Sequence, residues 1–404
     1  MKIKRYINQN AVITFVVALI FICVFVILGQ IRLGRNLSER IITAGFIYDG
    51  DESTPYTYNF IRTQNDIEKE FGEKIRVLVK TNVPESEVGS SIQELIDSGC
   101  NLIFLNSYGF QFKAKEFAAM YPNIQFCQAT GDNSLDEPLK NYHTFMGEIY
   151  QGRYISGIVA GMKLQELLKN GVITPSEAKL GYVAAFPYAE VISGFTAFLL
   201  GVRSVVPFAT MNVRYVNTWN NYSLERDCTL KLIEDGCVII SQHSDSIAPA
   251  VVCEEAHSEK VVFHVGYNQS MINIAPTTSL ISSKINWFPY MEAAVKAVMR
   301  NYPIEKGLKV HVNGNDSGAG FENNWVQMLD LNRTIAAEGT LKKITEVESA
   351  FKKGKVHVFF GDYTGKNPFN EQDVCNLNEE FKENETRSAP SFCYILDDVV
   401  NCVQ

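Results

Sequence analysis

The chain has 404 residues, of which 46% are hydrophobic and 20% are charged, and its formal net charge is −8. This length allows two or three domains with substantial cores, and the apolar content excludes a disordered chain. The acidic balance argues against a nucleic-acid binder, which would carry a basic surface. Residues 1–40 contain six Lys or Arg against one Glu, whereas residues 370–404 contain eight Asp or Glu against two Lys or Arg. The sequence therefore divides into a basic start, a body and an acidic tail.

An uncharged apolar run, Ala11–Gly29, dominates the first forty residues. As a helix it would be about 28 Å long, close to the thickness of a bilayer's hydrocarbon core. No A-x-A cleavage site follows it, and Cys23 lies inside the run, so a cleaved leader and a lipidated cysteine both fit poorly. Basic residues flank the run on both sides, so the charge rule does not settle its orientation. We predict an uncleaved transmembrane anchor in residues 1–40, with a cytoplasmic stub and the body outside the cell.

From residue 41 onward, short β-branched apolar runs alternate with amphipathic segments of helical period, which predicts parallel sheets covered on both faces. Gly, Pro and Ser cluster at Gly171–Lys179 and indicate a break between two lobes. The predicted strands are Ile41–Tyr48, Ile75–Lys80, Leu102–Asn106, Ile124–Gln128, Leu180–Ala184, Asn212–Asn217, Val238–Gln242, Val261–Val265 and Leu280–Ser283. The predicted helices include Tyr58–Phe71, Glu85–Ser98, Gly147–Lys169, Glu190–Val205, Ser223–Asp235 and Trp287–Asn301.

The residues directly after the predicted strands are rich in aromatic, amide, hydroxyl and acidic side chains. Open α/β sheets bind ligands at the carboxyl ends of their strands. A phosphate site would show Gly-rich turns with Lys, whereas this set suits a flat, uncharged heterocycle with a hydrogen-bonding edge. Each Asn or Asp alone is also an ordinary turn former. The segments are Tyr48–Gly50, Asn106–Tyr108, Thr130–Gly131, Phe186–Tyr188, Asn217–Trp219, His243–Asp245 and Tyr267–Asn268.

Motifs of catalysis and of metal or cofactor binding are absent from the sequence. There is no G-x-S-x-G, H-E-x-x-H or P-loop, and Gly361–Lys366 (GDYTGK) is too short for a phosphate-binding loop. No C-x-x-C occurs, and no Cys/His set has zinc spacing. We therefore expect neither an enzyme nor a cofactor or metal site. Cys375, Cys393 and Cys402 in the tail could include one disulfide, and their pairing is left open.

Several dense, collinear segments resemble one known family. They include GEIYQGRYISGIVAG (Gly147–Gly161), LGYVAAFPYAEVISGFTAFLLGVRS (Leu180–Ser204), VNTW (Val216–Trp219), SQHSDSIAP (Ser241–Pro249) and NWFPY (Asn286–Tyr290). Over about residues 41–365 the chain is similar to the basic membrane protein (BMP, PnrA-like) family of ABC-transporter substrate-binding proteins. The resemblance implies an α/β type I periplasmic-binding-protein fold, in which two Rossmann-like lobes joined by a three-strand hinge close on a purine nucleoside or purine base.

Carried over position by position, the resemblance implies eight ligand-binding residues. The family places an aromatic residue of its first loop against the base, and Tyr56 stands there in this chain, with Phe186 or Trp219 as the second aromatic face. The residues expected to hydrogen-bond the edge of the base are Glu190, Asn217 and Asp245, and the remaining lining residues are Tyr108 and Tyr267.

The resemblance leaves one acidic position of the first loop open. Asp49, Asp51 and Glu52 all lie near it, so recognition of a ribose is undecided. Trp287 is expected to pack at the hinge or at a helix start. Arg153 and Arg203 are expected to pair with carboxylates between helices.

The expected domains are the anchor region 1–40, a two-lobed domain over 41–369 and a tail over 370–404. The first lobe would span about 41–172 with segments returning after about 284, and the second about 178–280 with later segments. The tail is expected to be a solvated end, with a transporter contact or a strap over a lobe as alternatives. The implied partners are the small-molecule ligand, an ABC permease and the membrane. The alternative function is a membrane-tethered sensor that uses the same fold to signal to a partner.

Overall fold

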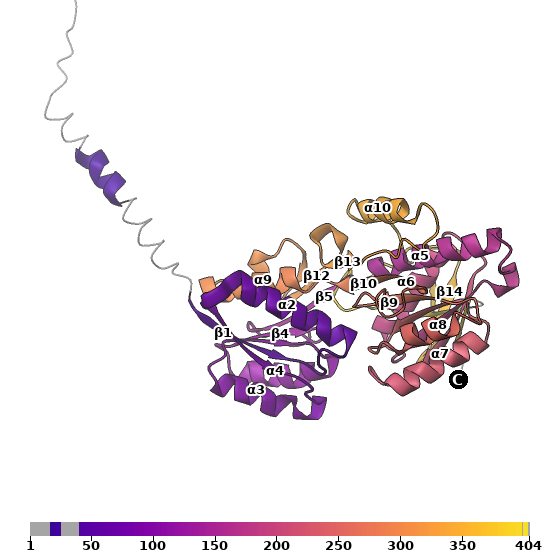
Figure 1. The fold of residues 1–404 in the computed structure, drawn as a ribbon. Coiled ribbons are helices and arrows are strands. Elements are labelled where there is room, and N and C mark those ends of the chain that lie inside the picture. The colour runs from indigo at the N-terminus through magenta and orange to yellow at the C-terminus, as the bar shows by residue number, and fades with distance from the viewer. Residues whose placement is uncertain (1–16, 26–39, 398, 403–404) are drawn as a thin grey trace, which may run out of the picture.

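The computed structural model describes residues 17–25, 40–397 and 399–402, and its body consists of two α/β lobes (Figure 1). The strands of the first lobe are β1 (Ile42–Ile47), β2 (Ile75–Lys80), β3 (Leu102–Leu105), β4 (Gln125–Ala129), β5 (Tyr142–Gly147), β11 (His311–Asn313) and β12 (Asp316–Ala319). Its helices are α2 (Pro55–Phe71), α3 (Val88–Asp97), α4 (Gln111–Met120) and α9 (Phe288–Arg300). The strands of the second lobe are β6 (Lys179–Ala184), β7 (Thr210–Tyr215), β8 (Ile239–His243), β9 (Phe263–Tyr267), β10 (Ser279–Ile285), β13 (Val326–Met328) and β17 (Val400–Cys402). Its helices are α5 (Tyr150–Lys169), α6 (Ala189–Arg203), α7 (Tyr222–Glu234), α8 (Ala248–Ala256) and α10 (Thr340–Phe351).

Each lobe is built on one seven-stranded sheet. The order is β11-β12-β5-β4-β3-β1-β2 in the first and β13-β10-β9-β8-β6-β7-β17 in the second. Pairing is parallel except at β11–β12 and β10–β13. Helices cover both faces, so central strands such as β3 (LIFL) are buried throughout. The predicted pair of parallel-sheet lobes is confirmed.

The two lobes are connected three times, by the segments β5–α5, β10–α9 and β12–β13. These segments lie side by side, because Glu148 N–H donates to the Ala319 carbonyl (2.8 Å) and Asn286 N–H donates to the Trp325 carbonyl (2.7 Å). Trp287 is buried at the start of α9 and stacks on Phe60 at 4.4 Å, which agrees with the packing role expected for it. Three adjacent crossings give the lobes a common hinge region.

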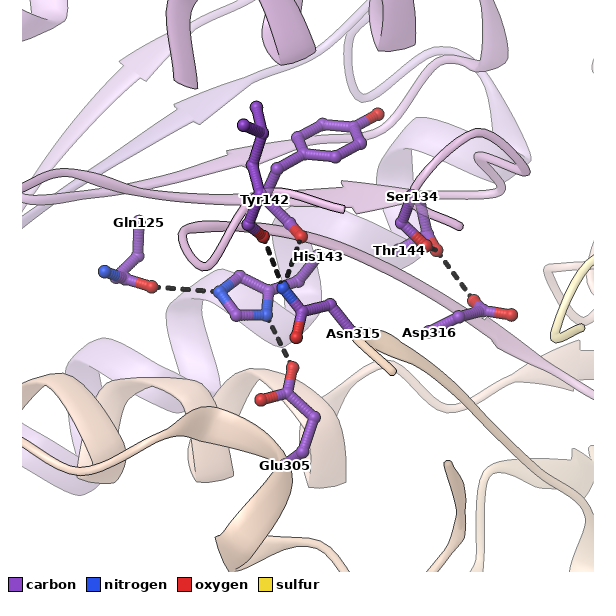
Figure 2. Close-up of polar contacts among 9 residues, drawn as sticks. Gln125, Ser134, Tyr142, His143, Thr144, Glu305, Asn315 and Asp316 are labelled. Carbon is purple, nitrogen blue, oxygen red and sulfur yellow. Dashed lines mark hydrogen bonds and ion pairs between the residues drawn. The ribbon is translucent and has the colours of Figure 1, made fainter. Parts of the chain in front are cut away.

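The sequence did not predict strand β5, because its residues His143 and Thr144 are polar. Their hydrogen-bond partners lie on other segments of the chain (Figure 2). His143 Nδ1 lies 2.5 Å from a carboxylate oxygen of Glu305, and its Nε2 lies 2.9 Å from Gln125 Oε1. The Thr144 hydroxyl donates to Asp316 at 2.7 Å. Since each buried polar group is satisfied, a strand that looks too polar for a core occupies the middle of the sheet.

Helices α5 and α6 cross so closely that their backbones are in contact. A Cβ atom added to Gly157 would lie 2.0 Å from the Phe198 carbonyl oxygen, and one added to Gly201 would lie 2.1 Å from the Tyr154 carbonyl oxygen. Only glycine permits this approach. The crossing fixes the position of α6, whose first turn carries Glu190.

The tail is folded, so the expectation of a solvated end is wrong. We define the C-terminal extension as residues 355–397 and 399–402. It contains a small antiparallel sheet of β14 (Thr364–Asn367), β15 (Asn370–Asn376) and β16 (Ile395–Leu396), and it ends in β17, which pairs with β7. Phe392 is fully buried and stacks on Phe359 at 4.5 Å. The buried apolar side chains of the extension thus belong to the main hydrophobic core of the body.

Of the predicted anchor, only residues 17–25 are described, as a short helix, and the rest of Ala11–Gly29 lies outside the described residues. Within the described part of the chain, no helix has both the length and the hydropathy needed to cross a bilayer. The anchor stays a prediction. All nine cysteines are described as free thiols, so the disulfide considered for the tail is not formed in this structure.

Candidate ligand-binding site

A pocket with about 380 Å³ of empty space lies between the two lobes, at the carboxyl ends of their strands. The residues that line it from the first lobe are Asp49, Tyr56, Asn106, Ser107, Tyr108 and Thr130. Those from the second lobe are Glu190, Trp219, His243, Asp245 and Tyr267. We call this pocket the inner cleft.

The first-lobe wall is organised around Asn106, which follows β3. Its side-chain amide donates to Asp49 Oδ1 (2.9 Å), and its side-chain oxygen accepts the Asp49 N–H (3.0 Å). Thr57 also donates to Asp49 (3.1 Å), and the Tyr56 hydroxyl donates to the Asn106 carbonyl (2.5 Å). Burial raises the pKa of the Asp49 carboxyl, and these hydrogen bonds oppose that rise. The wall therefore presents an oriented carboxylate and the ring of Tyr56.

Asp245 dominates the second-lobe wall. It follows β8, its N–H donates to the Trp219 carbonyl (2.8 Å), and the residue is only 9% exposed. None of the described residues donates a hydrogen bond to its carboxylate, and its pKa is raised well above the usual value, first by burial and then by Asp49, Glu225 and Glu190. Its carboxylate lines the inner cleft and is free to accept a hydrogen bond from a bound ligand there.

His243 lies behind Glu190, with its Nε2 3.4 Å from Glu190 Oε1. Burial lowers the pKa of His243, although Glu190 acts in the opposite direction, so the imidazole is held toward its neutral form. Tyr267 packs edge-on against this ring at 4.8 Å. His243 therefore contacts both Glu190 and Tyr267 at the cleft.

Arg153 lies beneath Tyr267, with its guanidinium 4.6 Å from the centre of that ring. It donates to the Gln242 carbonyl (2.6 Å) and to the Tyr182 hydroxyl. No carboxylate of the described residues forms an ion pair with it, so the expectation of a carboxylate partner is wrong. Arg203 likewise donates to the Tyr363 hydroxyl (3.0 Å) and to a carbonyl, not to a carboxylate. Both arginines are structural supports outside the cleft surface.

Six of the eight residues expected from the resemblance lie on the inner cleft: Tyr56, Tyr108, Glu190, Trp219, Asp245 and Tyr267. Phe186 is not part of the lining, because it packs against Trp219 at 5.2 Å and stacks on Tyr188 at 4.9 Å. Asn217 is also off the lining. Its φ is +55°, and its N–H donates to the Ala185 carbonyl (2.8 Å), so it serves the turn after β7.

The expected set omitted five lining residues: Asp49, Asn106, Ser107, Thr130 and His243. All of them except His243 directly follow a strand or lie one residue beyond, and His243 ends β8. Their position after predicted strands was therefore the feature of the sequence that could have identified them as lining residues.

The chemistry of the inner cleft is acidic and aromatic. Its charged lining residues are the carboxylates of Asp49, Glu190 and Asp245, and neither Lys nor Arg lines it. Among the described residues, no group of three or more His, Cys, Asp or Glu is arranged to hold a metal ion. Such a cleft can stack a flat ring and accept hydrogen bonds from it, whereas it repels a phosphate.

Comparisons with known proteins agree with this geometry. A family model described as ABC transporter substrate-binding protein, PnrA-like, matches residues 41–353. A purine-binding protein of Brucella abortus (strain 2308) is 28% identical over 330 residues, which cover 81% of this chain and 86% of that protein. A Haloferax volcanii protein provisionally named as an ABC transporter glucose-binding protein is 35% identical over 205 residues, 51% of this chain and 48% of that protein.

The solved structure of an ABC transporter solute-binding protein from Aeropyrum pernix K1 superposes with a TM-score of 0.62 at 14% identity. It covers 82% of this chain and 95% of that one. This likeness shows the shared two-lobed fold, which is the periplasmic-binding-protein type expected from the resemblance.

Proposed function

Since this chain belongs to the PnrA-like family of ABC transporter substrate-binding proteins, we propose that it captures a purine nucleoside or a purine base between its lobes and delivers it to an ABC permease. The binding domain would lie outside the cytoplasmic membrane, held by the N-terminal segment. The observation that carries the choice of ligand is Asp245, a buried carboxylate without a donor in the described protein, set beside aromatic rings.

A purine matches the chemistry of the residues that line this cleft. Its flat rings can stack on Tyr56 or Trp219, and its N–H and amino groups are donors for carboxylates. Asp49 and Asp245 come from opposite lobes, so one ligand that donates to both would favour the closed arrangement. The acidic lining also disfavours nucleotides, since a phosphate would face carboxylates.

The names of the relatives suggest two ligand classes. The Brucella relative, named as purine-binding, aligns with most of this chain, whereas the Haloferax relative, named with glucose, aligns with half of it. We favour the purine because of the longer alignment and the aromatic cleft. Glucose is the control ligand for this choice.

The test is calorimetric titration of the purified full-length chain with adenosine, guanosine, inosine, adenine, guanine, hypoxanthine, xanthine and glucose. Submicromolar binding of at least one purine, with no heat from glucose, is the expected result. Tight binding of glucose and silence from every purine would overturn the proposed ligand.

The sensor alternative differs in its partner, not in its ligand. Affinity purification from the native membrane should recover a permease with the ligand-loaded protein. Recovery of a kinase or chemoreceptor in place of a permease would contradict the transport role.

A further inference from the structure

We propose that Glu225, which is not among the residues that line the inner cleft, is a positioning residue that holds two ligand loops of the second lobe together. The first, residues 216–221 between β7 and α7, carries Trp219 and is called the Trp219 loop. The second, residues 244–247 between β8 and α8, carries Asp245 and is called the Asp245 loop. This inference rests on the function proposed above, because that function assigns both residues to the ligand.

Glu225 lies on α7 and is fully buried. Its Oε1 accepts the N–H of Asn221 (3.1 Å), which belongs to the Trp219 loop. Its Oε2 accepts the hydroxyl of Ser244 (2.7 Å) and the N–H of Ser246 (3.2 Å), which belong to the Asp245 loop. One buried carboxylate therefore bonds to both loops.

The Asp245 loop is also held from its other side. The side-chain amide of Gln242, which is buried, donates to the carbonyls of Ser244 (3.0 Å) and Ser246 (2.8 Å). The N–H of Asp245 itself donates to the carbonyl of Trp219 (2.8 Å). Because these buried groups are paired on both sides of Asp245, the backbone that carries its carboxylate is fixed.

The contacts of Glu225 require a carboxylate. Donors from the protein face both of its oxygens, whereas a glutamine has one oxygen to accept and one NH₂ group that donates. In Glu225→Gln we expect the oxygen to stay with the two donors of the Asp245 loop, so that the NH₂ group faces the N–H of Asn221. Two donors cannot bond to each other, and the variant should therefore release the Trp219 loop.

The matched control is Glu254→Gln, the same substitution in the same lobe. Glu254 of α8 accepts the N–H of Thr277 (3.2 Å) and the hydroxyls of Thr277 (2.7 Å) and Thr278 (2.8 Å). These threonines directly precede β10, so they lie at the amino ends of the strands, at the opposite edge of the sheet from the inner cleft. The control thus loses a similar set of hydrogen bonds away from the ligand loops.

The full-length proteins are titrated with adenosine, guanosine, adenine and guanine. We expect Glu225→Gln to weaken the tightest of these interactions by about 10- to 100-fold, because the loop hydrogen bonds to a charged group are lost. Glu254→Gln should stay within about twofold of the wild type. Ser244→Ala removes one donor to Glu225 and should weaken binding by about 3- to 10-fold.

Tryptophan fluorescence of the ligand-free protein reports the position of the Trp219 loop separately. The chain has three tryptophans, and Trp287 and Trp325 are buried, whereas Trp219 is half-buried. Acrylamide quenching should be stronger in Glu225→Gln than in the wild type. It should be unchanged in Glu254→Gln, and in Ser244→Ala, which keeps the contact of Glu225 with Asn221.

These measurements separate positioning from a general structural role. Unchanged affinity or unchanged quenching in a Glu225→Gln protein that melts cooperatively would overturn the proposal, as would an equal loss of affinity in Glu254→Gln. If Glu225→Gln does not melt cooperatively, Ser244→Ala decides, and unchanged affinity in that variant would overturn the proposal. Silence of the wild type toward every purine would remove the proposed ligand, and quenching would then decide whether Glu225 positions the Trp219 loop.

Discussion

Replacing Asp245 by Asn is expected to weaken ligand binding while it stabilises the empty protein. The carboxylate lies in a residue that is 9% exposed, and it has no hydrogen-bond donor among the described residues. A hydrogen bond to a charged group contributes about 1.5–3 kcal/mol. Since about 1.4 kcal/mol corresponds to a tenfold change in affinity, the variant should bind its purine about 10- to 150-fold more weakly.

The opposite effect on stability comes from the same burial. The pKa of Asp245 is raised in the folded state, so the wild-type protein loses stability as the pH rises through that folded pKa. The Asn variant has no carboxyl to ionise and does not lose this stability. At neutral pH its ligand-free Tm should exceed that of the wild type. Calorimetry gives the affinity and a thermal melt gives the stability, with Asp362→Asn as an exposed control. Equal purine affinity in Asp245→Asn and the wild type would refute the assignment of this carboxylate to the ligand.

Three further predictions concern stacking, packing and pH. Tyr56→Ala should weaken purine binding by about tenfold with a cooperative melt retained, because its ring is only partly buried; collapse of the melt would make Tyr56 a core residue instead. Gly201→Ala should lower the free energy of unfolding by about 1–3 kcal/mol in urea titrations, because its Cβ would lie 2.1 Å from a carbonyl of α5. Gly89→Ala, whose Cβ would meet its nearest neighbour at 3.6 Å, is the control and should cause no loss. Burial raises the pKa of Glu383 to about 7, so the stability of the protein should fall as the pH rises from about 5 to 7. Thermal melts across this range should show a smaller fall for Glu383→Gln. An unchanged pH dependence in the variant would argue against titration of Glu383.

Much of the fold follows from local sequence pattern, because buried parallel strands must be apolar along their length. β3 is of this kind, and its predicted bounds match within a residue. β5 escaped prediction because His143 and Thr144 are satisfied by Glu305 and Asp316, more than 160 residues later. A local pattern does not contain such partners.

The site was predictable to the extent that it depends on strand ends. The rule that ligands bind where parallel strands end marks Asp49 and Asn106, whereas the family pattern marks Tyr56 and Asp245. Neither separates a cleft residue from a turn former, as Asn217 shows, because that distinction depends on where one side chain points. The fold of the C-terminal extension lies outside both rules, since its position is set by contacts between segments distant in sequence, such as Ser388 with Asp316 and β17 with β7.

The most direct test of purine binding in the inner cleft is a crystal structure of this chain with the purine that calorimetry shows to bind most tightly. We expect the base in the inner cleft, against Tyr56 or Trp219, with a donor of its edge within hydrogen-bond distance of Asp245. A purine bound elsewhere, or one that leaves the Asp245 carboxylate without a donor, would contradict it.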